Sequence, residues 1–99
     1  MNKALSALAL ARRAGKLVIG FDAVMKSVQK RETVLVVLAE DLSSKTAKEA
    51  RFFCEKYGAE AVQRAVSLHD AETVLGKRAG VFGITDRGFQ RLLKSAGCD

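Results

Sequence analysis

The sequence contains no proline and no tryptophan, only two cysteines and a single histidine. Without proline, or a stretch rich in glycine or serine, nothing in its 99 residues is typical of an interdomain linker, so we predict one domain covering residues 1–99. A domain of this length needs no disulfide or metal to stay folded. Cys54 and Cys98 lie at no metal-ligand spacing. We interpret them as a buried thiol and an incidental tail thiol, and expect no cofactor and no metal.

Long apolar runs are also missing. The longest strongly apolar run, residues 34–39, is far too short to cross a bilayer. Residues 4–11 are apolar, like the core of a signal peptide, but only Lys3 precedes them. Arg12 and Arg13 follow where a cleavage site needs small residues. We therefore predict a cytoplasmic protein without a membrane partner.

The positive charge is concentrated in the first third of the chain. The sequence has 17 lysines and arginines against 11 acids, a formal net charge of +6. Residues 1–31 contain seven bases and one acid, Asp22, whereas the rest of the chain has equal numbers of both. A high isoelectric point alone is equally compatible with simple solubility. The asymmetry favours a surface that binds a polyanion.

Apolar spacing and capping residues predict helices that alternate with short strands. Helices are expected at residues 3–14, 20–31, 43–58, 67–76 and 86–96, and strands at 17–19, 33–39, 60–66 and 81–85. The helical spacing assigns to the core Ala23, Val24, Val28, Ala47, Ala50, Phe53, Cys54, Tyr57, Ala71, Val74, Leu75, Phe89, Leu92, Leu93 and Ala96. The strand at 33–39 is apolar without alternation, which is typical of a strand covered on both faces. The pattern predicts an α/β fold, a three-layer α/β/α sandwich with a mixed, roughly four-stranded sheet.

Signatures of enzymes are mostly absent: there is no dinucleotide fingerprint, Walker loop or paired-histidine metal motif. His69 has no nucleophile beside it and lies in the first turn of a predicted helix. Glu40 and Asp41 follow the central strand at its carboxyl end, where α/β sheets bind ligands. They could act as acid and base or hold a metal, but no second chemical group accompanies them. We favour a capping role at the third helix and predict a protein that is not an enzyme.

The junction between the first strand and the second helix is the strongest candidate site. Gly20 exposes backbone N–H groups at the positive end of the helix dipole, which favours an anion. Lys16 precedes the strand, and Lys26 and Lys30 are one turn apart on the helix. We predict that a phosphate backbone contacts the amides of Gly20 and Phe21 with these lysines around it. Phe21 could instead be a core residue.

A second basic element, Lys77 and Arg78, lies in the turn between Gly76 and Gly80. If the sheet brings this turn beside residue 20, the two elements form one clamp. No helix-turn-helix or zinc-finger pattern indicates DNA, and aromatic residues are too few for a stacking platform. A preformed RNA bend needs only a basic junction and small loops. We predict structured RNA, not DNA, as the partner of a monomer.

Three segments resemble, in order and over nearly the whole chain, the superfamily of kink-turn RNA-binding ribosomal proteins of archaeal and eukaryotic large subunits. They are RAGKLVIGFDAVMKSVQK, VLVVLAED and LGKRAGVFGITDRGF, and they are most similar to the short bacterial YlxQ-like branch. The resemblance implies an α/β/α sandwich around a four-stranded mixed sheet, no catalysis and recognition of a sharply bent RNA. It also implies that Gly20, Phe21, Asp22 and Lys26 enter the RNA groove.

The sequence departs from the superfamily at two places. Strong kink-turn binders carry Asn–Glu after the glycine, whereas this chain has Asp22 and Ala23. Alanine accepts no hydrogen bond, and aspartate faces phosphate with the wrong charge. The loop from Gly76 to Val81 is short and basic instead of long and apolar. We therefore expect RNA binding of altered specificity, with ribosomal RNA as one candidate. The alternative is a module that docks on an acidic protein or a ribonucleoprotein.

Overall fold

A computed structural model describes residues 2–97 of the chain. Its strands form one mixed sheet in the order β1-β4-β2-β3, in which β4 is antiparallel to both neighbours and β2 is parallel to β3. The elements in chain order are α1 (Lys3–Arg13), β1 (Leu17–Ile19), α2 (Phe21–Gln29), β2 (Leu35–Leu38), α3 (Ser44–Tyr57), β3 (Glu60–Gln63), α4 (Leu68–Leu75), β4 (Val81–Ile84) and α5 (Arg87–Ala96). None of these helices is long and apolar enough to cross a membrane.

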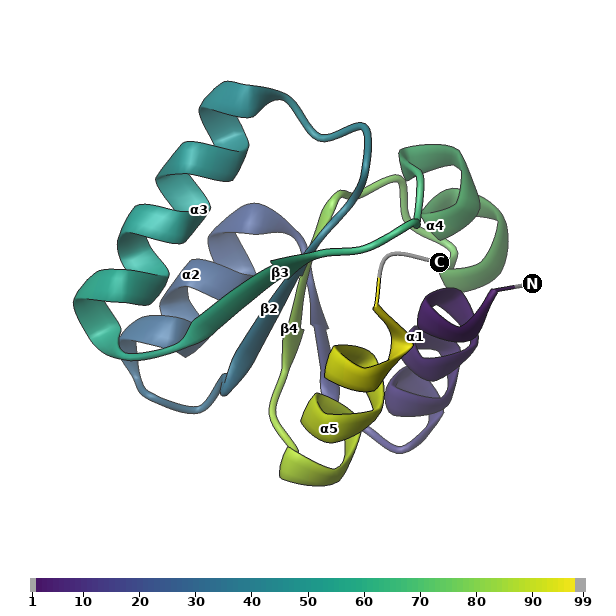
Figure 1. Cartoon of the computed structure of the whole chain (residues 1–99), viewed down its shortest axis with the longest axis horizontal. Coiled ribbons are helices and arrows are strands. Elements are labelled where there is room, and N and C mark those ends of the chain that lie inside the picture. Colours follow the sequence, from purple (N-terminus) through teal and green to yellow (C-terminus); the bar gives the residue numbers. More distant parts are fainter. Residues whose placement is uncertain (1, 98–99) are drawn as a thin grey trace.

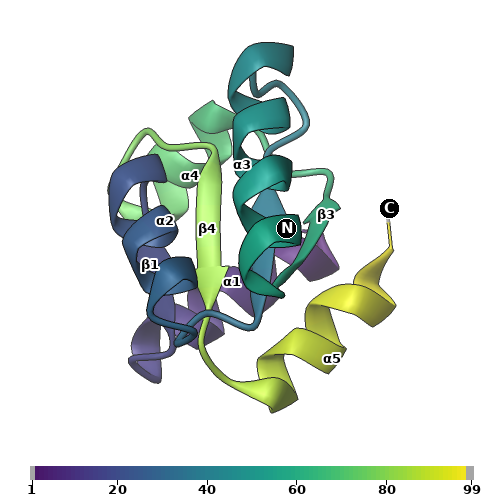
Figure 2. The same cartoon turned by 90° about the vertical axis from the view of Figure 1, so that its left-hand side faces the viewer.

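The sheet separates two apolar cores. Figure 1 shows α2 and α3 on one face and α1, α4 and α5 on the other, and Figure 2 shows the same layers turned by 90°. Leu35 and Val37 of β2 point into the core beneath α1, α4 and α5, whereas Val36 and Leu38 point into the core beneath α2 and α3. All four residues are buried, as expected for a strand covered on both faces. The predicted three-layer α/β/α sandwich is confirmed.

Local sequence determines where the helices begin and end. Side chains cap the N-termini of four helices: Asn2 for α1, Ser43 for α3, Ser67 for α4 and Asp86 for α5. The Ser67 and Asp70 pair forms a capping box, as predicted. Gly58 and Gly76 end α3 and α4 in the left-handed conformation.

Three strands are shorter than predicted, and the strand expected at 81–85 differs least, since it ends at Ile84. The strand expected at 33–39 covers only Leu35–Leu38, because Thr33 bonds locally instead of pairing in the sheet. Its Oγ1 lies 2.6 Å from Oγ of Ser27 inside the protein, and its N–H donates to the Ser27 carbonyl. The strand expected at 60–66 ends at Gln63, after which a tight turn joins Val66 to Arg64.

Two predicted core residues are wrong. Ala23 is exposed, and Met25 is buried in its place, so the buried face of α2 is rotated from the predicted one. Leu92 is 47% exposed, because α5 buries the stripe that contains Leu93 and Ala96. In a helix, consecutive residues point about 100° apart, so the neighbour of a buried residue can face solvent.

Cys54 is buried beneath α3, as predicted, with 2% of its surface exposed. Burial raises the pKa of its thiol from 9.0 to about 11, although nearby Arg51 lowers it. Cys98 lies outside the described residues.

The raised thiol pKa predicts a loss of stability in alkali. Because the folded pKa of Cys54 exceeds the unfolded value, its contribution to stability is complete below pH 9 and is lost as the pH rises toward 11. In a Cys98→Ser variant at pH 9, alkylation of Cys54 should be far slower in the folded protein than in denaturant. Equal alkylation rates in the two states would contradict burial as the cause.

A side chain at Gly83 should destabilise the fold, because β4 passes too close to its neighbours at this position. A Cβ on Gly83 would lie 2.9 Å from Oγ1 of Thr33 and 3.3 Å from Cγ1 of Val24. Gly83→Ala should therefore lower the free energy of unfolding by about 1–3 kcal/mol, measured by denaturant titration. The exposed Glu49→Ala is the control and should change it by less than about 0.5 kcal/mol. Equal effects of the two variants would refute the steric argument.

Candidate nucleic-acid interface

Four connecting segments meet at one end of the sheet. Because β4 is antiparallel to its neighbours, its first residue, Val81, pairs with Leu38 at the end of β2, and Phe82 pairs with Ile19 at the end of β1. Leu38 also pairs with Gln63, the last residue of β3. We call this the junction end of the sheet, at the top of Figure 1. Its connecting segments are Gly20 and residues 39–43, 64–67 and 76–80.

The sheet brings the turn at 76–80 beside Gly20. The N–H of Gly20 donates to the carbonyl of Val81, at 2.9 Å. The turn carrying Lys77 and Arg78 leads directly into Val81. It therefore lies beside Gly20, which is the arrangement that a single clamp requires. Both basic side chains are exposed. Arg78 lies 3.9 Å from Glu72, an exposed ion pair of little strength.

The N-terminus of α2 has no side-chain cap, in contrast to the other four helices of residues 2–97. The first intrahelical bond runs from the N–H of Val24 to the Gly20 carbonyl, at 2.9 Å. The amides of Phe21, Asp22 and Ala23 precede it and have no intrahelical acceptor. The carboxylate of Asp22 is exposed in the same turn and offsets part of the positive helix dipole. The surface at this point is thus formed by backbone donors rather than by cationic side chains.

The side chain of Phe21 is part of the core, which was the alternative to a contact with RNA. It is half-buried and packs against the core between α2, α3 and the sheet. Phe21 can therefore offer its backbone amide at the surface, while its ring stabilises the start of α2 against the core.

The three lysines predicted around Gly20 are not gathered there. Lys16 lies at the other end of β1, where its carbonyl accepts from the N–H of Thr85, and the four residue steps from Lys16 to Gly20 span about 13 Å. Lys30 is the C-terminal cap of α2, about 14 Å along the helix from its start. The exposed Lys26 lies on α2 about 8 Å from the start of the helix. Of the three, Lys26 is nearest to the junction end.

The acidic pair after β2 has a structural role that differs from the predicted one. Asp41 accepts a hydrogen bond from the N–H of Leu68, at 3.0 Å, and so adds an acceptor at the start of α4, whose N-cap is Ser67; the cap of α3 is Ser43. Glu40 is exposed, and its N–H donates to the Val66 carbonyl. Together these bonds join the segments 39–43 and 64–67. No three His, Cys, Asp or Glu side chains of residues 2–97 gather to hold a metal ion.

His69 is exposed in the first turn of α4, where it was predicted.

The sequence reasoning missed two contributions to this end of the molecule. A Cβ on Gly80 would lie 2.8 Å from Cδ1 of Leu42 and 3.0 Å from Cδ2 of Leu68, so both leucine side chains pack directly against the backbone of Gly80. Nη2 of Arg12 lies 3.9 Å from the position of a Cβ on Gly76, so the side chain of Arg12, from α1, lies beside the start of the basic turn. The glycines at both ends of the basic turn could have indicated the close packing at Gly80. No spacing in the sequence indicates that Arg12 lies beside Gly76.

The backbone conformation of Gly20 should become strained when any other residue replaces the glycine. It has φ 104° and ψ 146°, a region essentially restricted to glycine, and a Cβ there would meet nothing within 4 Å. Gly20→Ala should lower the free energy of unfolding by about 1–3 kcal/mol through strain alone, measured by denaturant titration. An unchanged midpoint would show that the junction relaxes to another conformation.

Comparison with known proteins identifies the family. Residues 2–89 match the family model described as "Ribosomal protein L7Ae/L30e/S12e/Gadd45 family". The RNA-binding protein YlxQ of Bacillus subtilis (strain 168) is 38% identical over 89% of this chain and 88% of its own length. The RNA-binding protein YlxQ of Enterococcus faecium is 30% identical over 94% and 89%.

Solved structures have the same architecture. A protein of unknown function from Bacillus halodurans C superposes with a TM-score of 0.87 at 32% identity, covering 97% of both chains. The Giardia lamblia 15.5kD RNA binding protein shares the fold, with a TM-score of 0.76 at 15% identity over 95% of this chain and 81% of its own. The resemblance to the YlxQ-like branch is confirmed, and the chain belongs to the ribosomal protein L7Ae/L30e/S12e/Gadd45 family.

Proposed function

We propose that the protein is a non-enzymatic, cytoplasmic RNA-binding domain that binds structured RNA across the junction end of its sheet. The observation that carries the proposal is the hydrogen bond from Gly20 to Val81, which places the uncapped start of α2 next to the turn of Lys77 and Arg78. The two curated relatives are both named RNA-binding proteins and match this chain over nearly their whole length, which supports the proposal.

The two elements suit a bent RNA better than a straight one. Neighbouring strands lie about 4.8 Å apart, so the amides after β1 and the basic turn before β4 face almost the same point. A sharp bend brings two stretches of phosphate backbone close enough to contact both elements at once. A regular duplex would place a single stretch there. We therefore propose a kink-turn or a similar bend as the ligand, with ribosomal RNA as a candidate source.

Base recognition in this proposal differs from that of the strong kink-turn binders. Asp22 and Ala23 are both exposed on the first turn of α2, so they face a ligand at the junction end. Ala23 offers no acceptor to a base, and Asp22 repels phosphate. Contacts to phosphate position a protein on RNA without reading its sequence, so binding can persist while specificity changes.

Docking on an acidic protein or a ribonucleoprotein is the second candidate, and the exposed Asp22 and Ala23 favour it. Nuclease treatment before purification separates the two functions. A partner protein that stays bound after nuclease treatment favours docking, and loss of every partner favours RNA binding.

The RNA proposal predicts a steep salt dependence and a local charge effect. Binding of a kink-turn RNA, a straight RNA duplex and the matching DNA should be measured by filter binding at several salt concentrations. The kink-turn RNA should bind most tightly. Lys77→Gln/Arg78→Gln should weaken its binding about tenfold and reduce the salt slope by about one per lost phosphate contact.

The matched control is Arg87→Gln/Arg91→Gln, which removes the same charge from the exposed face of α5, a helix that begins at the opposite end of the sheet. It should change affinity by less than about twofold, because long-range steering is screened by salt. No binding of any RNA at low salt would refute the proposal. Equal losses in both double variants would refute the place of the interface.

A further inference from the structure

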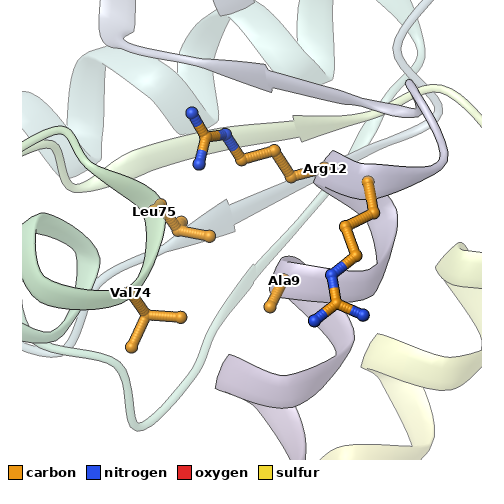
Figure 3. Close-up of a pocket in the computed structure, with 5 residues that line it drawn as sticks. Ala9, Arg12, Val74 and Leu75 are labelled. Carbon is orange, nitrogen blue, oxygen red and sulfur yellow. The ribbon is translucent and has the colours of Figure 1, made fainter.

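A pocket lies between α1 and α4, on the face of the sheet opposite α2. Its volume is about 380 Å³, and it is lined by Ala9, Arg12, Arg13, Val74 and Leu75 (Figure 3). Pockets of a few hundred Å³ are large enough for a small ligand. The half-buried Ala9 and Val74 form an apolar wall, Leu75 packs behind it with no exposed surface, and the two arginines supply the charge. The pocket thus combines an apolar surface with cationic donors.

The two guanidinium groups have no acidic partner. Both Arg12 and Arg13 are exposed, and no carboxylate of residues 2–97 lies within ion-pair distance of either. Glu72, the acid of α4 that precedes Gly76 by one turn, lies 3.9 Å from Arg78. The arginines compensate the negative end of the α1 dipole, which is a weak and screened interaction. Their five N–H donors each remain available to an anion.

The pocket adjoins the proposed RNA interface. Nη2 of Arg12 lies 3.9 Å from the Cβ position of Gly76, the residue that ends α4 and begins the turn at 76–80. In Figure 3 the side chain of Arg12 extends toward Leu75 at the end of α4. A strand of RNA that contacts Lys77 can therefore continue past Gly76 into the pocket without leaving the basic surface.

We propose that this pocket binds one nucleotide of the bound RNA, with its phosphate at Arg12 and Arg13 and its sugar or base against Ala9 and Val74, which Leu75 supports from beneath. The inference rests on the proposed function and extends the interface from the junction end onto α1 and α4. Guanidinium groups bind phosphate oxygens through paired N–H donors, and an apolar wall shelters the face of an unstacked base. A carboxylate ligand would use the arginines alone, whereas a nucleotide uses both parts of the pocket.

The test compares Arg12→Gln/Arg13→Gln with Arg87→Gln/Arg91→Gln in the filter-binding assay with kink-turn RNA. Loss of the pocket arginines should weaken binding about tenfold and reduce the salt slope, although Lys77 and Arg78 are intact. The control should change affinity by less than about twofold. Both pairs are exposed, so thermal unfolding should show that each variant is folded.

A second measurement reports on the apolar wall. In methyl NMR spectra, the signals of Val74 and Leu75 should shift when RNA is added to the wild-type protein, and should stay in place in Arg12→Gln/Arg13→Gln. If RNA binds while these methyl signals do not move and the two double variants behave alike, the pocket is not part of the interface, and the proposed function stands without it.

If the wild-type protein binds no RNA, the proposed function fails and the pocket is tested alone. Adenosine 5′-monophosphate and inorganic phosphate are then the probes. Shifts of the Val74 and Leu75 methyl signals with the nucleotide but not with phosphate would support a nucleotide site. No shift with either probe, or equal shifts with both, would overturn the inference.

Discussion

The central strand β4 is antiparallel to both β1 and β2, and this pairing connects the first third of the chain to its C-terminal half. It favours a backbone without a side chain at Gly83, because Thr33, held by its hydrogen bond to Ser27, covers that position. All four residues of β4 are buried, and they contribute to both apolar cores. Without the pairing, neither face of the sheet would be complete, and the basic turn before Val81 would not lie beside Gly20.

The candidate interface follows from the same pairing. The start of α2 has Gly20 in place of a side-chain cap, which costs a few tenths of a kcal/mol, roughly, relative to a capping side chain. Its free amides lie next to the turn of Lys77 and Arg78, so the structure accepts a less stable helix end where an anion can complete it. Arg12 extends the cationic surface from the turn to α1. The cationic side chains and backbone donors thus form one surface over α1, the start of α2 and the turn at 76–80, which is distant from the other two in sequence.

Most of the fold was predictable, because its signals are local. Caps such as Ser67 and terminal glycines such as Gly58 act within one turn, so the helices were found within a few residues of their observed bounds. The site was predicted less well. Lys16 is close to Gly20 in sequence, but a strand carries it to the other end of the sheet. Asp41 accepts from the first amide of α4 instead of capping the adjacent α3, since the segments 39–43 and 64–67 are joined across the sheet.

The order of the elements, the buried strand β2, the excess of charge in the first third and the glycine at the strand-to-helix junction can all be read from the amino-acid sequence. These depend on composition and on residues a few positions apart. Which charges meet is a property of the folded chain. The contact between Gly20 and Val81, and the approach of Arg12 to Gly76, join segments more than sixty residues apart. Such contacts arise from strand order and helix packing, which no local spacing encodes.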